Sequence, residues 1–279
     1  MKKYTYTFIL CLLISFFSYA QQHKYNALEK EAFKKALYFA YEDNPRIALH
    51  HFKQFAVSYP NSALMPKVTY NTAVLLRDLG DIEQAIPLFR KVLYTEYDYD
   101  IIDEDDHKEL EKEYIVCKNK SAMHLAEIYL DKRDFKKAST YIYLFDQKHK
   151  FDHFCGNEHV AHDMYTAKMY ARLYAGQQKH QKAIAELIPF MFQNPFADND
   201  EVITLLGRLL ETNYSSQELR SAAEVAVYTI KSTGSDIIID FLNHKVKIER
   251  ATIIDDLDRY KNFVKSNPLI KKYLSETQS

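Results

Sequence analysis

The chain has 279 residues, of which 37 are basic and 38 are acidic, so its formal net charge is only −1. This balance excludes a general electrostatic attraction to nucleic acid or to anionic lipid. Only 5 glycines and 7 prolines occur, which argues against long unstructured linkers. Because apolar residues also recur with a helical period along most of the chain, the composition predicts a nearly all-α protein.

The first twenty residues predict a secretory signal peptide. Lys2 and Lys3 form a positive start, an apolar run follows, and Ser18 and Ala20 occupy the small-residue positions of a cleavage site. The apolar run is shorter than the roughly 18 residues expected of a spanning helix. We therefore expect residues 1–20 to be removed after Ala20 and the protein to be exported, as a periplasmic or outer-membrane-associated protein. An uncleaved N-terminal anchor is the alternative.

A two-helix pattern recurs four times between residues 29 and 195. In each copy one alanine is followed twelve residues later by a second alanine, and a large apolar residue lies three residues after the first. The alanine pairs are Ala36 and Ala48, Ala73 and Ala85, Ala126 and Ala138, and Ala171 and Ala183, and the large residues are Phe39, Leu76, Tyr129 and Tyr174. Where two helices cross closely, only a small side chain fits. We therefore expect each copy to be a pair of antiparallel helices joined by a short turn.

This pattern resembles the tetratricopeptide repeat (TPR) family, and especially exported bacterial members such as the repeat component of the outer-membrane barrel assembly machine. The resemblance implies an all-α fold, namely a TPR-like right-handed α-solenoid of helix hairpins, with copies at residues 29–62, 66–99, 119–152 and 164–197. Prolines after the second helix, Pro60 and Pro195, fit the family. Two features depart from it: the spacing between copies is uneven and longer than about 34 residues, and the usual glycine after the first small residue is absent.

The repeat rule fades after Pro195, although helical periodicity continues. Residues 200–232 predict a degenerate helix pair that completes a repeat domain spanning residues 21–234. Residues 235–279 then form a C-terminal cap, which a solenoid needs to end without an exposed core. Within the cap, the segment from Asp236 to Glu249 predicts either a short β-hairpin that turns at Asn243 and His244 or a continuous helix.

Two segments between copies carry polar side chains that suggest metal ligands. Residues 95–113 form an acidic insertion, which lacks the spacing of a calcium-binding loop and is better interpreted as a solvated loop leading into a long helix. The segment from His149 to His162 is rich in histidine, and its weak zinc candidates are His153, Cys155, His159 and His162. Their spacing matches no common zinc motif, so a polar loop is the favoured interpretation and we predict no metal.

Two cysteines, Cys117 and Cys155, remain after removal of the signal peptide. Export permits a disulfide between them, and neighbouring copies would bring the two positions to one side of a solenoid. A pair of free thiols is the alternative, and the sequence alone does not decide between them.

No motif of nucleophilic, phosphate-binding, dinucleotide-binding or metalloprotease chemistry occurs, so we predict a non-enzyme without a cofactor. In a solenoid the first helix of each copy lines a concave surface. The predicted groove residues there are Lys30, Phe33, Lys67, Tyr70, Arg77, Lys120, Met123, Tyr165, Lys168 and Arg172. Cations beside apolar anchors suit a polypeptide partner that is acidic or presents its C-terminus. The alternatives are an ordinary solvated helix surface, a structural subunit of an envelope assembly, or a metal-binding protein that uses the His149–His162 segment.

Overall fold

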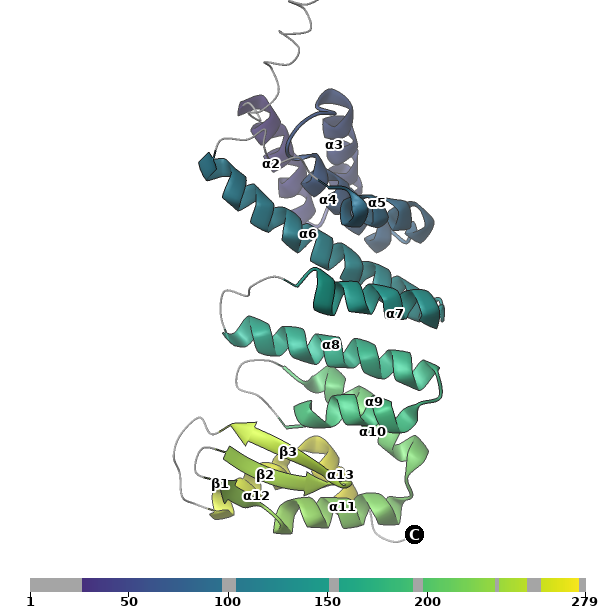
Figure 1. The fold of residues 1–279 in the computed structure, drawn as a ribbon, viewed down its shortest axis with the longest axis vertical. Coiled ribbons are helices and arrows are strands. Elements are labelled where there is room, and N and C mark those ends of the chain that lie inside the picture. The colour runs from purple at the N-terminus through teal and green to yellow at the C-terminus, as the bar shows by residue number, and fades with distance from the viewer. Residues whose placement is uncertain are drawn as a thin grey trace, which may run out of the picture. The chain divides into compact units, whose positions relative to one another are not determined.

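The computed structural model describes residues 27–96, 104–150, 156–192, 198–233, 236–249 and 257–275. These residues are mostly helical (Figure 1). They fall into two compact units: the first contains residues 1–128 and 143–151, and the second contains residues 129–142 and 152–279. The predicted signal peptide lies outside the described residues. Among the described helices, none is long and apolar enough to cross a membrane.

Each of the four predicted copies contains two helices in the predicted order, so the prediction of a mostly helical protein is confirmed. The pairs are α2 (Ala27–Tyr41) and α3 (Pro45–Ser58), α4 (Met65–Asp78) and α5 (Ile82–Tyr94), α6 (Glu104–Asp131) and α7 (Phe135–Tyr143), and α8 (Gly156–Gly176) and α9 (His180–Leu187). A π-helical turn, Leu144–Lys148, continues α7, and a 3₁₀ turn, Ile188–Phe190, continues α9. A fifth pair follows, α10 (Asp200–Asn213) and α11 (Ser216–Tyr228).

One turn geometry closes all four hairpins. In each, the residue five positions before the second alanine has a left-handed backbone: Asp43 (φ 55°), Gly80 (φ 87°), Arg133 (φ 57°) and Gln178 (φ 62°). The next backbone N–H donates to the carbonyl of the large residue: Asn44 to Phe39 at 3.0 Å, Asp81 to Leu76 at 2.8 Å, Asp134 to Tyr129 at 2.9 Å and Lys179 to Tyr174 at 2.8 Å. This is the Schellman closure of a helix C-terminus. The large residue of the repeat rule therefore also supplies the carbonyl oxygen that accepts the closing hydrogen bond at the end of the first helix.

The alanine pairs lie on the buried faces of their helices. All eight alanines are completely buried, and α2 packs along α3, α4 along α5, and α8 along α9. The large residues one turn after the second alanine, Phe52, Phe89, Ile142 and Leu187, are also fully buried. The burial of small and large residues in alternation is what close helix crossing requires.

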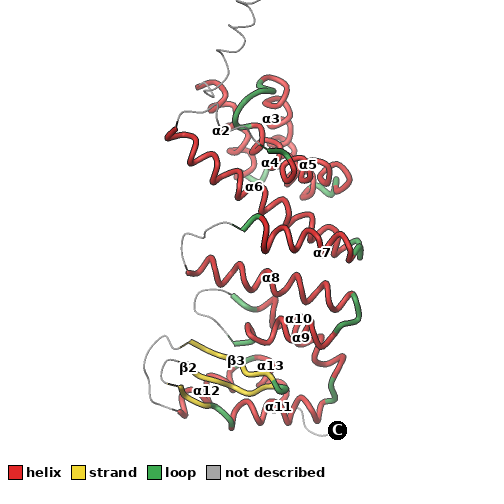
Figure 2. Tube along the Cα trace, viewed as in Figure 1, coloured by secondary structure: helices red, strands yellow, loops and turns green. Residues whose placement is uncertain are grey.

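The C-terminal part of the chain contains the three strands (Figure 2). β1 (Lys231–Thr233), β2 (Asp236–Phe241) and β3 (His244–Glu249) form an antiparallel sheet in that order. The β-hairpin interpretation of Asp236–Glu249 is thus confirmed, but the turn lies one residue earlier than predicted. Leu242 and Asn243 both have positive φ, as a two-residue type I′ turn requires.

The sheet belongs to the hydrophobic core of the second unit. Ile237, Ile239 and Phe241 alternate along β2 and are buried, and β2 packs against α11. Two short helices, α12 (Leu257–Ser266) and α13 (Pro268–Ser275), complete this core, and both contact α11. The strand β1 is an addition that the sequence analysis did not predict.

Candidate partner-binding surfaces

The predicted groove cations of the first unit are paired with carboxylates. Lys67 on α4 lies 2.8 Å from both carboxylate oxygens of Glu113 on α6. Arg77 at the other end of α4 lies 2.8 Å from Asp78 and 3.4 Å from Glu127 on α6. These side chains therefore join the first helices of two successive copies. Their charges are neutralised within the fold, and their place in a partner-binding groove stays a prediction.

The same arrangement occurs within the second unit. Lys168 on α8 pairs with Glu201 on α10 and lies 4.8 Å from the ring centre of Tyr165. Arg172 donates to Asp131 at 2.6 Å. Of the predicted groove cations, only Lys30 and Lys120 are exposed without an ion pair inside the described part of the chain.

Phe33 is not an exposed anchor, contrary to the prediction. Only 6% of it is accessible, and its ring meets Phe52 and Phe55 edge-on with centroids 5.8 and 6.2 Å away. Leu110, near the start of α6, belongs to the same hydrophobic core as these rings. Met123 remains half-buried beside the exposed Lys120 on α6.

Tyr70 belongs to a buried polar cluster that we call the His124 network, formed by Tyr70, Arg77, His124 and Glu127. The Tyr70 hydroxyl lies 3.2 Å from Nε2 of His124, whose ring also stacks near Tyr70. A guanidinium nitrogen of Arg77 contacts Nδ1 of the same ring, and Glu127 lies 3.6 Å from that nitrogen. The network connects α4 to α6 through side chains that are mostly withdrawn from water.

The groups around His124 shift the pKa of its ring. Arg77 and Glu127 both approach Nδ1, and the Tyr70 hydroxyl faces Nε2. Burial is the main cause that lowers the pKa of His124; Arg77 also lowers it, whereas Glu127 raises it. The network is thus built around an uncharged imidazole.

We expect acid to weaken the first unit through this ring. An unfolded histidine has a pKa near 6.5 and the folded value is lower, so the unfolded chain binds the proton more readily. The stabilisation is complete above about pH 6.5 and is lost as the pH falls through the lowered folded pKa. Urea unfolding of the wild type and of His124→Gln at pH 8, 6 and 5 checks this. The glutamine keeps one acceptor and one donor, so the variant should lose less stability with acid; equal slopes would contradict this role of His124.

Two of the five predicted metal and disulfide positions lie outside the described residues. His153 and Cys155 are not described, while His159 is exposed and His162 is half-buried on α8. Within the described ranges, no three potential ligands gather closely enough to hold a metal ion. Cys117 is a buried free thiol whose pKa burial raises to about 11. Its pairing with Cys155 stays a prediction.

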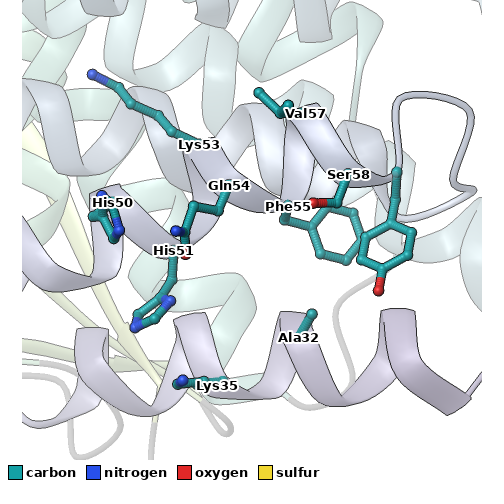
Figure 3. A pocket seen from close by; sticks show the side chains of 10 residues that line it. Ala32, Lys35, His50, His51, Lys53, Gln54, Phe55, Val57 and Ser58 are labelled. Atoms are coloured by element: carbon teal, nitrogen blue, oxygen red, sulfur yellow. The ribbon is translucent and has the colours of Figure 1, made fainter.

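A second surface, which the sequence analysis missed, lies on the first hairpin, α2 and α3. A depression of about 740 Å³ is lined by residues of both helices, and Figure 3 shows His51 and Phe55 on the side of α3 that faces α2 and Lys53 and Val57 on its other side. Lys35 lines the depression from α2, and His50, His51 and Lys53 line it from α3. The sequence did contain a signal: His50 and Lys53 flank the buried Phe52 and are exposed on α3, whereas His51 has the spacing of the packed stripe and is half-buried.

Comparisons with protein-family models, with curated proteins and with solved structures gave no match.

Proposed function

We propose that this chain is a non-catalytic helical-repeat protein that is exported to the bacterial cell envelope and binds another polypeptide there. The proposal includes a TPR-like right-handed solenoid arrangement of the hairpins, whose first helices line the binding groove. A scaffold of this kind needs no cofactor, because its work is recognition by surface contact.

The observation that carries the proposal is the recurrence of one hairpin design. Four copies share the buried alanine pair, the left-handed turn residue and the Schellman bond. Stacked hairpins of uniform design present extended surfaces made from equivalent positions of successive copies, which suits an elongated polypeptide better than a small molecule.

The paired cations narrow the groove to fewer residues than the sequence suggested. Lys120 and Met123 lie three residues apart on α6, so they are neighbours on the surface of this helix. Lys120 is exposed and Met123 is half-buried, so together they offer a charge beside an apolar contact. Lys67 and Arg77 instead hold the helices that frame these residues.

The test is capture of a partner from the native envelope by tagged protein, with quantification of each recovered polypeptide. We expect Lys120→Glu combined with Met123→Ala to reduce recovery of the specific partner at least about tenfold, since a contact of about 1.4 kcal/mol corresponds to that factor. Lys182→Glu combined with Ala185→Ser, on the exposed face of α9, is the control and should leave recovery unchanged.

The outcomes separate the groove from the function. If the Lys120/Met123 variant recovers the partner as well as the control variant does, the binding surface lies elsewhere on the chain. Recovery of no polypeptide above an untagged control, in repeated preparations of folded protein, would contradict the proposed function itself.

A further inference from the structure

We propose that the depression lined by α2 and α3 is a docking site for an acidic segment of a partner polypeptide. This inference rests on the proposed function and gives it a location and a partner chemistry. It concerns a face of the first hairpin that is separate from the His124 network and from Lys120 and Met123.

The lining of the depression is positively charged. Lys35, His50, His51 and Lys53 line it, and its lining contains no aspartate or glutamate. Lys35 and Lys53 have no ion pair with any described residue, in contrast to Lys67 and its neighbours on α4. A pair of lysines that the fold leaves uncompensated gains charge-assisted hydrogen bonds when a carboxylate arrives.

His51 lies close to the positive charges of Lys35 and His50. Its ring stacks on Phe39 with centroids 5.0 Å apart. Burial lowers the pKa of His51, and the charges of Lys35 and His50 lower it further. A neighbouring carboxylate from a partner would relieve this crowding of positive groups.

The depression also has apolar lining residues. Ala32, Phe55 and Val57 also line the depression (Figure 3), and Val57 is 83% exposed. Of the nine large apolar residues that are exposed in the described chain, five lie on this hairpin: Leu28, Tyr38, Tyr41, Ile47 and Val57. Of these five, Val57 lines the depression together with Lys35 and Lys53, and an exposed apolar side chain beside cations is typical of an interaction surface.

The concave shape favours a peptide over a membrane. The cations line a hollow of about 740 Å³, which accepts the side chains of a short segment but which the surface of a bilayer would only cover. Recognition would combine carboxylates near Lys35 and Lys53 with an apolar side chain near Val57. The partner segment should therefore alternate acidic and apolar residues.

The experiment is selection of a random peptide library on the immobilised wild-type protein, followed by measurement of the affinity of each enriched peptide by fluorescence anisotropy. We expect enriched peptides to carry a net negative charge. We expect Lys35→Glu combined with Lys53→Glu to weaken their binding at least about tenfold, in a salt-dependent manner. The matched control, Lys91→Glu combined with Lys112→Glu, reverses two exposed lysines of α5 and α6 and should change the affinity less than twofold.

Each other result overturns the inference in a distinguishable way. Enriched peptides that bind the Lys35/Lys53 variant as well as the wild type would reject this site while leaving the proposed function intact. Binding to vesicles with 30% phosphatidylglycerol, lost in the same variant while peptide binding persists, would assign the patch to lipid instead. A library that yields no binder above background would count against both proposals.

Discussion

Replacing Ala85 by leucine is expected to lower the free energy of unfolding by about 1–3 kcal/mol. Ala85 is completely buried on α5, and α5 packs along α4, which carries the equally buried Ala73. Three added carbon atoms at this crossing have no space to enter, because fully buried Phe89 and Leu76 fill the positions beside it. The helices must separate or the leucine must leave its preferred rotamer.

Urea unfolding followed by circular dichroism measures this cost. Ala185→Leu provides the control, since Ala185 is exposed on α9 and the same substitution there should change stability by no more than about 0.5 kcal/mol. An Ala85→Leu protein as stable as the wild type would show that the alanine pair is not a close crossing, and would remove the physical basis of the repeat rule.

Replacing Asn267 by leucine is expected to cost about 2–4 kcal/mol. The Asn267 side chain is buried, and its oxygen accepts hydrogen bonds from the backbone N–H groups of Leu269 and Ile270, at 3.0 and 3.2 Å. Its amide nitrogen donates to the carbonyl of Met191 at 2.8 Å. A leucine leaves two buried N–H groups at the start of α13 without their acceptor. It also removes the hydrogen bond to the carbonyl of Met191, which follows α9 and its 3₁₀ turn.

Asn267→Ser separates the two contributions. A serine oxygen still caps α13, whereas it does not replace the amide donor to Met191, so we expect an intermediate loss of about 1–2 kcal/mol. Thermal unfolding monitored by calorimetry gives the comparison. If both variants unfold at the same temperature as the wild type, the stability of α13 does not depend on this asparagine.

The sequence predicted the helices well because the repeat rule is a local packing rule. Two alanines twelve residues apart specify a hairpin from positions within one copy, and each copy could be checked against the others. The turn residues were harder to predict, because only Gly80 is a glycine. Asp43, Arg133 and Gln178 adopt the same left-handed backbone at a cost of roughly 1–2 kcal/mol each, which the surrounding hairpin offsets.

The groove was predicted less well because its environment depends on contacts between copies. Lys67 was identified as a groove cation, but its partner Glu113 belongs to the segment 95–113 that was interpreted as an insertion, and the end of this segment forms the first part of α6. Without the register of α6 against α4, the sequence did not show that these charges neutralise each other. Phe33 was misplaced for the same reason, because Leu110 of α6 extends the core in which it is buried.

Site-specific photocrosslinking in intact cells tests the central claim, polypeptide binding, most directly. A photoreactive amino acid is placed at Lys120 and at Val57 in separate proteins, with the exposed Ala185 of α9 as the control position. We expect a discrete polypeptide adduct of constant mass from Lys120 or Val57, and none from Ala185. Folded, exported protein that yields no polypeptide adduct from either position would contradict polypeptide binding.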